Sequence, residues 1–446
     1  MNLAPLARAI TLATAGSVLL AIPSLASAAF IEDSTASLGF RNLYMNQDTR
    51  HSPSIDADSR EANRTSNKTK KEWSQAFILN YKSGFTEGTI GVGVDIYAAT
   101  GIKLDSGPYR TADTFPQGNN NKSKDNFGKL GGTFKAKTSE TLLEVGTLMP
   151  RLPLVQANLQ GRLLPQVFTG GILTSNEIEG LTARLGHLDR VNHRSSSNHD
   201  RMEMNVVGKR LYDKKGKKNI GGGNRGDYTS NSFDLASLDY KWNDSLTTGY
   251  NFGRLKDMYK QHIVTAVHTL PLGEQRSLKT DLRVSRSTND GSQIRVDNKA
   301  FSGMVTYNFG FNKLGLGYQK MTGDTGYAYM QGTDPFLVNF VANREFGAKD
   351  EKSWQVRHDY NFAGLGIPGL TMFNRYVKGT GASILDKNGN KMEGREWERD
   401  FDISYAFQEG ALKNFNVRWR NSTVRSNIFK SLDDNRLILS YTLPLL

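Results

Sequence analysis

The feature that most restricts the fold is an alternation of apolar and polar residues, with a period of two, that recurs from Ala36 to the C-terminus. It is clearest at 437–445, where alternate residues are Leu, Leu, Tyr, Leu and Leu. Similar segments occur at 401–408, 354–362, 246–252 and 90–96. Successive side chains of a β-strand point to opposite faces, so this period predicts an all-β chain.

Segment length and aromatic placement favour a membrane barrel over a soluble sandwich. A sandwich also alternates, but its strands are shorter and its apolar face forms an inner core. Many segments here reach about nine to eleven residues and have Tyr, Trp or Phe near their ends, as in transmembrane barrel strands. Only 37% of the residues are hydrophobic, and there are 44 glycines. This composition fits one thin apolar band around a wet interior rather than two or three soluble domains.

Closure of the sheet is expected because an unpaired edge is not tolerated in hydrocarbon. After the first 28 residues the chain has 446 − 28 = 418 residues, which suggests an even number of roughly 16 to 20 strands. Short connections at Asn243-Asp244 and Phe311-Asn312 are predicted to be periplasmic turns. The long polar stretches predicted to be external loops are 47–71, 104–126, 193–231 and 386–396.

Residues 1–28 have the pattern of a secretory signal peptide. Arg8 precedes an apolar run at 10–22, Pro23 follows, and Ala26-Ser27-Ala28 gives a small-residue cleavage pattern. The alternative is a membrane anchor, but the run is short for a span of about 20 residues, and no later segment has 18 consecutive apolar residues. We therefore expect a leader at 1–28 and one barrel domain at 29–446.

Charge and cysteine content narrow the function. The formal net charge is +13, and a basic exported protein is expected to meet acidic solutes or lipopolysaccharide phosphates rather than nucleic acid. The chain has no cysteine, which excludes disulfides, thiolate nucleophiles and Cys-based metal sites. No cofactor is indicated.

Two connections are too apolar for exposed loops. The stretch 146–171 contains Pro150, Pro153 and Pro165 among many Leu, Val, Met and Phe residues, so it is expected to fold into the barrel. The stretch 322–349 is rich in aromatic residues and is expected to do the same.

Parity on the segment 415–425 places two arginines on the lumen wall. Val417 and Trp419 are expected to face lipid, where charge is costly, so Arg418 and Arg420 face inward. Guanidinium groups stay ionised and bind carboxylates bidentately, and a row of them helps an anion to pass without forming a deep trap.

The same parity turns further basic residues inward, whereas Arg375 remains ambiguous because 370–378 does not separate into two faces. The alternative is that these arginines only solvate the lumen or pair with inward carboxylates such as Asp95, Asp359 and Asp402. The additional inward cations are Arg41, Arg184, Arg357, Lys129, Lys135 and Lys137.

Signals for catalysis or metal binding are weak. His187, His193 and His199 are six residues apart, which matches no common metal spacing. The glycines at 221–223 lie in a basic loop without a following helix, and no nucleophile elbow is present. We do not expect an enzyme.

Several strings together resemble the OprD family of substrate-specific outer-membrane porins of pseudomonads, over nearly the whole chain after the leader. They are AFIEDSTASLGFRN at 29–42, GRLLPQ and TSNEI within 146–180, EKSW and FAGLGIPGLTMFNRY within 351–376, and NVRWRN at 416–421.

This resemblance implies an 18-stranded barrel in the bacterial outer membrane, often a loose trimer, whose third and seventh external loops form a narrow constriction. It implies that Arg418 and Arg420 belong to a basic ladder that guides a substrate carboxylate. It places Arg151 and Arg162 near the constriction, and Tyr327, Tyr329 and Asp334 in the seventh loop.

Two functions follow as hypotheses. The first is passive, carboxylate-selective diffusion of amino acids, small organic acids or short peptides. The second is a barrel whose long basic loops serve surface binding or adhesion to lipopolysaccharide or a partner.

Overall fold

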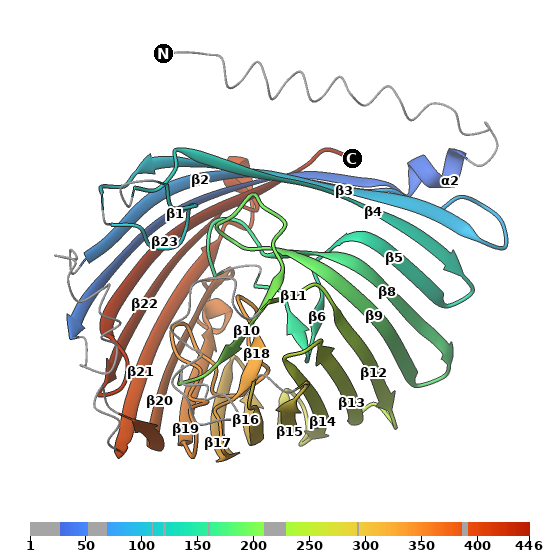
Figure 1. Cartoon of the computed structure of the whole chain (residues 1–446). Coiled ribbons are helices and arrows are strands. Elements are labelled where there is room, and N and C mark those ends of the chain that lie inside the picture. Colours follow the sequence, from blue (N-terminus) through green and yellow to red (C-terminus); the bar gives the residue numbers. More distant parts are fainter. Residues whose placement is uncertain are drawn as a thin grey trace.

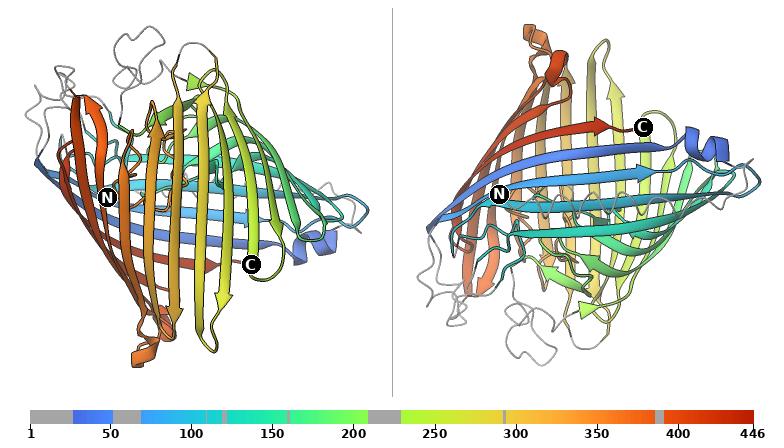
Figure 2. Two further views of the ribbon diagram at one scale, coloured as in Figure 1. Left: turned by 90° about the horizontal axis from the view of Figure 1, so that it is seen from below. Right: turned by 90° about the horizontal axis from the view of Figure 1, so that it is seen from above.

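The computed structural model describes residues 27–51, 69–108, 110–118, 122–158, 161–208, 229–291, 294–385 and 391–446. Eighteen strands form one antiparallel sheet that closes into a barrel, as Figures 1 and 2 show. This confirms the predicted all-β transmembrane barrel and the strand number of 18. The signal-peptide prediction concerns residues that lie almost entirely outside the described ones. Within the described residues a short helix, α2 (Ser27–Glu32), precedes the barrel.

Each barrel strand pairs with the one that follows it along the barrel wall, and the last pairs with the first. The barrel strands are β1 (Thr35–His51), β2 (Thr69–Lys82), β3 (Gly91–Asp105), β4 (Asn126–Thr138), β5 (Thr141–Leu148), β8 (Val167–Ile178), β9 (Leu181–Asn192), β12 (Phe233–Lys241), β13 (Leu246–Leu255), β14 (Tyr259–Pro271), β15 (Arg276–Asn289), β16 (Asp297–Phe309), β17 (Asn312–Gly323), β19 (Lys352–Asn361), β20 (Leu370–Leu385), β21 (Lys391–Ala406), β22 (Asn416–Ser426) and β23 (Ser431–Pro444).

Smaller elements lie in the connections. They are the hairpin β6 (Arg151–Leu152) and β7 (Val155–Gln156), the small sheet β10 (Met202–Val206), β11 (Thr229–Ser230) and β18 (Ala328–Met330), and the 3-10 turns η4 (Phe362–Leu365) and η5 (Gly410–Leu412). No helix among the described residues is long and apolar enough to cross a membrane.

The pairing of β1 with β23 closes the barrel. Leu38 lies opposite Leu443 and Phe40 opposite Tyr441, and the rings of Phe40 and Tyr441 are 6.2 Å apart. The ladder leaves no unpaired strand edge to face hydrocarbon.

Connection length distinguishes the two ends of the barrel. Short turns lie at the end that holds the start of β1 and the end of β23, including the predicted turn at Asn243-Asp244. The turn predicted at Phe311-Asn312 lies one residue earlier, at Gly310-Phe311, because β17 already begins at Asn312. Long connections lie at the other, external end. The predicted external loop at 386–396 is partly wrong, because β21 already begins at Lys391.

The two strand faces have the predicted polarity. Leu130, Leu185 and Leu316 are at least 60% exposed on the outer surface, whereas Gln355 and Asp402 are buried on the inner one. Outward apolar side chains form the lipid-facing band.

Loops L3 (149–166, between β5 and β8) and L7 (324–351, between β17 and β19) fold into the barrel, as predicted. The flanks of the stretch 146–171 belong to β5 and β8, so the loop is shorter than expected. Leu154, Val155, Leu163 and Leu164 of L3 are buried against inward apolar side chains of the wall. The inner face is therefore apolar where a loop covers it.

The lipid-facing band can be tested near the middle of β14, where Val264 faces outward and Thr265 faces the lumen. We expect Val264→Arg to destabilise the barrel by about 2–4 kcal/mol, because an arginine is placed in hydrocarbon. Thr265→Arg should cost much less. Equilibrium unfolding in lipid vesicles measures both values, and equal losses would contradict the assignment of the two faces.

Candidate functional site

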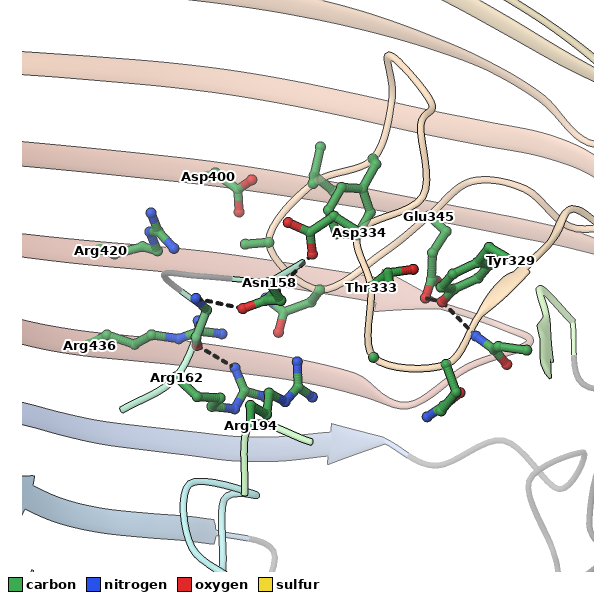
Figure 3. Close-up of a pocket in the computed structure, with 18 of the residues that line it drawn as sticks. Asn158, Arg162, Arg194, Tyr329, Thr333, Asp334, Glu345, Asp400, Arg420 and Arg436 are labelled. Carbon is green, nitrogen blue, oxygen red and sulfur yellow. Dashed lines mark hydrogen bonds between the residues drawn. The ribbon is translucent and has the colours of Figure 1, made fainter. Parts of the chain in front are cut away.

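A cavity of about 540 Å³ lies inside the barrel where L3 and L7 approach the wall. Figure 3 shows arginines on one side of this cavity, and Asp334, Glu345 and Tyr329 on the other. We call this constriction the eyelet. Two opposed walls of opposite charge define its chemistry.

The basic wall is assembled from distant parts of the chain. Arg375 of β20, Arg420 of β22 and Arg436 of β23 project from the barrel wall. Arg162 comes from L3, and Arg194 comes from L4 (193–232, between β9 and β12). The closed sheet brings these side chains together, because β20 to β23 are neighbours and the two loops fold inward.

Aspartates hold three wall arginines, Arg375, Arg418 and Arg420, through the Nε atom alone. The Nε atoms of Arg418 and Arg420 both donate to Asp402, each at 2.8 Å. The Nε atom of Arg375 donates to Asp400 at 2.7 Å. The terminal nitrogens, which bind carboxylates in pairs, are not used in these three contacts. One carboxylate between two guanidinium groups also leaves a net positive charge.

Arg436 connects the wall to L3. Its NH1 donates to the Gly161 carbonyl at 3.1 Å, while the nearly buried side chain also pairs with Asp434.

Burial, with repulsion from Arg194 and Arg436, lowers the pKa of Arg162 to about 9. The Arg162 guanidinium is therefore still charged at neutral pH.

The opposite wall consists of L7 and its neighbours. The Asn158 amide of L3 donates to Asp334 at 2.7 Å, which joins the two loops. The Tyr329 hydroxyl donates to Glu345 at 3.0 Å and accepts from Asn205. Burial raises the pKa of Asp334 above its ordinary value, although Asn158 and Arg194 oppose this effect. This wall therefore presents hydrogen-bond acceptors to the cavity.

A third loop, L2 (106–125, between β3 and β4), also packs against the inner wall, although the stretch 104–126 was predicted only to be an external loop. The buried carboxylate of Glu72 accepts hydrogen bonds from the backbone N–H groups of Ala112 and Thr114 at 2.8 and 3.1 Å. This contact holds L2 against the wall, so that Asp113 accepts a hydrogen bond from Arg194 at 2.8 Å. L2 thereby positions one arginine of the basic wall.

Lys129 of β4 anchors the base of L3. Its buried ammonium group donates to the carbonyls of Pro165, Asn192 and His193 at 2.8, 3.2 and 2.7 Å. Three acceptors satisfy its three donors, so the charge is stabilised by backbone dipoles. Gln166, which follows Pro165 in L3, donates a hydrogen bond to the backbone carbonyl of Gln331 in L7 at 3.1 Å. Lys129 thus lies where L3, L4 and L7 meet.

Five of the predicted site residues line the eyelet. They are Arg162, Tyr329, Asp334, Arg375 and Arg420.

Arg418 lies next to Arg420, and lines a second cavity of about 420 Å³ near the short turns, together with Lys313 and Phe373. Arg41 lies within electrostatic range of Arg418, Arg420 and Arg436. These positions extend the basic wall from the eyelet toward the periplasmic end.

The remaining predicted residues lie elsewhere. Arg151 is an exposed residue of the β6–β7 hairpin. Tyr327 of L7 is buried against the barrel wall, so neither residue lines the eyelet. Arg184 pairs with Asp239 at 2.7 Å and Arg357 pairs with Asp359 at 2.6 Å. Both face inward as predicted but lie nearer the short turns than the eyelet.

Several site residues were not predicted from the sequence. Arg436 has the same parity as Ile438, so it could have been found by extending the alternation back along β23. Arg194, Asp113 and Glu345 lie in loops without a period, and no signal identified them. Within the described residues, no group of three or more His, Asp or Glu side chains could hold a metal ion.

Comparisons with known proteins give a consistent result. A family model described as "outer membrane porin, OprD family" matches residues 28–445. The chain is 33% identical to the porin-like protein GalP of Pseudomonas putida over 425 residues, which are 94% of this chain and 93% of the relative. It is 47% identical to the crystal structure of Pseudomonas aeruginosa OpdQ, with a TM-score of 0.81 over 94% of this chain and 100% of that one. The chain is also 31% identical to Pseudomonas aeruginosa OpdK, whose crystal structure contains vanillate. The TM-score is 0.80, and the match covers 93% of this chain and 100% of OpdK.

The anchoring of L3 can be tested by ionic current through single reconstituted barrels. Lys129→Met leaves three carbonyls without their donor, each at a cost of about 1–3 kcal/mol, so L3 should loosen. We expect a higher mean conductance and more open-channel noise. Lys137→Met removes an exposed charge from the same face of β4 and is the matched control. If the Lys129→Met channel shows neither a higher conductance nor more open-channel noise, Lys129 does not anchor L3.

Proposed function

The chain belongs to the OprD family of outer-membrane porins, and from this premise we propose that it gives small carboxylate-bearing solutes passive passage across the outer membrane. As a porin it is a non-enzymatic channel for the uptake of small solutes, located in the outer membrane. The selectivity for carboxylates is our proposal. The observation that carries it is the arginine pair Arg418 and Arg420, which shares the single carboxylate of Asp402.

The basic wall offers a graded series of carboxylate sites. A solute carboxylate that enters the eyelet meets Arg420 and Arg375, whose contacts with aspartate use only Nε. It then meets Arg418 and Lys313 at the second cavity. Each site competes with a resident aspartate, so each binds the solute weakly. Several weak sites in a row favour conduction over trapping.

L7 provides the selection for the rest of the solute. Asp334 and Glu345 lie across the eyelet from the arginines, as Figure 3 shows. An ammonium or hydroxyl group on the solute can bind there while the carboxylate binds the basic wall. Amino acids, hydroxylated organic acids and short peptides have this arrangement of groups. The vanillate in the OpdK structure, a carboxylate with a hydroxyl group, supports this class.

A role mainly in surface binding or adhesion is less well supported. That hypothesis requires no passage through the barrel, whereas charged side chains line two successive cavities here. Contact with lipopolysaccharide is compatible with solute uptake.

Neutralising the arginine pair tests the proposal. Arg418→Gln with Arg420→Gln should lower the flux of small carboxylates into liposomes by about tenfold, because charge-assisted hydrogen bonds of about 1.5–3 kcal/mol are lost. The flux of neutral sugars of similar size should change little. Arg184→Gln is the control, because this inward arginine lines neither cavity. An unchanged carboxylate flux in the double variant would overturn the proposed selectivity.

The pH dependence of selectivity tests the role of L7. Because burial raises the pKa of Asp334, this carboxyl gains a proton at a higher pH than an exposed aspartate does. As the pH falls and Asp334 gains its proton, the eyelet loses negative charge and the ratio of anion to cation permeability should rise. The Asp334→Asn variant should have a higher ratio of anion to cation permeability at high pH, and this ratio should rise less as the pH falls. Asp244→Asn, at an exposed turn, should titrate like the unmodified protein, and a similar response of both variants would contradict the assignment.

A further inference from the structure

The outer surface of β20 to β22 carries a cluster of basic residues near the external end of the barrel. Glu396, Glu398 and Asp400 of β21 are buried on the inner side, beneath L7. The residues between and before them must therefore face outward. They include Arg395 and Arg399, both of which are exposed.

Strand register gathers further cations around these two arginines. Trp354, Lys378, Trp397 and Arg425 lie directly opposite one another on four successive strands. Arg50 of β1 joins them through Asp433, which it shares with Arg425. We call Arg50, Lys378, Arg395, Arg399 and Arg425 the outer basic patch.

Aromatic rings place this patch at the membrane interface. The rings of Tyr376 and Trp397 are 5.7 Å apart, and the Arg425 guanidinium lies 6.0 Å from the Trp397 ring. Outward aromatic residues mark the level of the lipid headgroups in outer-membrane barrels. β21 runs from the external end toward the periplasm, so Arg399 lies on the membrane side of Trp397, just before Phe401.

Protein carboxylates compensate only part of this charge. Asp433 accepts from both Arg50 and Arg425 at 2.7 Å, and Arg50 also pairs with Asp48 at 3.0 Å.

Arg395 lies 3.3 Å from Glu393. Within the described residues, neither Lys378 nor Arg399 has an ion pair. A guanidinium beside hydrocarbon is stabilised when it meets an anion, and the carboxylates of the described residues do not supply one to Arg399. An anionic lipid headgroup can supply it.

We propose that the outer basic patch binds the phosphate groups of lipopolysaccharide, with Arg399 and Lys378 as the main contacts. This inference goes beyond solute uptake and depends only on the position of the barrel in the outer membrane. Guanidinium groups bind phosphate oxygens in pairs, and the acyl chains of the same lipid lie against Tyr376 and Phe401 below them. The charges at the external end of the barrel match an anionic glycolipid of the outer leaflet.

The test compares the lipopolysaccharide retained by purified variants. We expect Arg399→Gln with Lys378→Gln to retain roughly tenfold less lipopolysaccharide than the unmodified protein after gentle detergent extraction. Added lipopolysaccharide should raise the unfolding temperature of the unmodified protein but not that of the variant. Conductance and carboxylate flux should stay unchanged, which separates this proposal from the proposed solute selectivity.

The matched control is Arg276→Gln with Lys413→Gln, which removes two exposed cations near the short turns. Its lipopolysaccharide content should equal that of the unmodified protein. The heat-dependent shift of folded barrels on gels verifies that each variant is folded. Equal retention by the two double variants would overturn the proposal. Equal stabilisation by inorganic phosphate, or by phosphatidylglycerol vesicles, would also overturn it, because the patch would then not be specific for lipopolysaccharide.

Discussion

Backbone hydrogen bonding in hydrocarbon is the constraint on which this structure depends. Every strand that faces lipid needs a partner on both edges, so eighteen strands close through the pairing of β1 with β23. Closure gives each strand one face toward lipid and one toward the lumen. The alternation in sequence then decides which side chains line the passage. Arg418 and Arg420 reach the lumen because Val417 and Trp419 occupy the positions that face lipid.

The lumen is specialised by loops rather than by strands alone. L3 and L7 need apolar surfaces to pack on, so parts of the inner wall are apolar beneath them. Polar contacts fix the same loops: Lys129 holds the base of L3, and Asn158 joins L3 to Asp334 of L7. The result is a narrow region with arginines on the wall and acceptors on L7. Aspartates such as Asp402 compensate part of the positive charge. In the proposed function this lets the wall attract anions without holding them tightly.

Strand parity made much of the fold and of the basic wall predictable. It placed Arg418 and Arg420 inward and would have placed Arg436 there as well. It failed for Arg375, because both faces of β20 contain apolar residues. Val377 faces inward and is fully buried, and Phe373 lies under the guanidinium groups of Arg357 and Arg375.

Loop contacts were much less predictable. The resemblance to porins indicated that L3 and L7 fold inward, but two of the five side chains that it suggested, Arg151 and Tyr327, do not line the eyelet. Tyr329 lines the eyelet, whereas Tyr327, two residues earlier in L7, packs against the barrel wall. The clamp of L2 by Glu72, and the pairing of Asp113 with Arg194, join segments far apart in the chain. No local pattern encodes such contacts.

The central claim is that alternate residues of each strand face water and lipid. Because the chain has no cysteine, single cysteines at 416 to 420 of β22 can report this directly. The rate of reaction with a charged, water-soluble thiol reagent is measured for each in lipid vesicles. The account predicts fast reaction at 416, 418 and 420 and slow reaction at 417 and 419. Equal rates along the strand, or fast reaction at 417 and 419 alone, would contradict it.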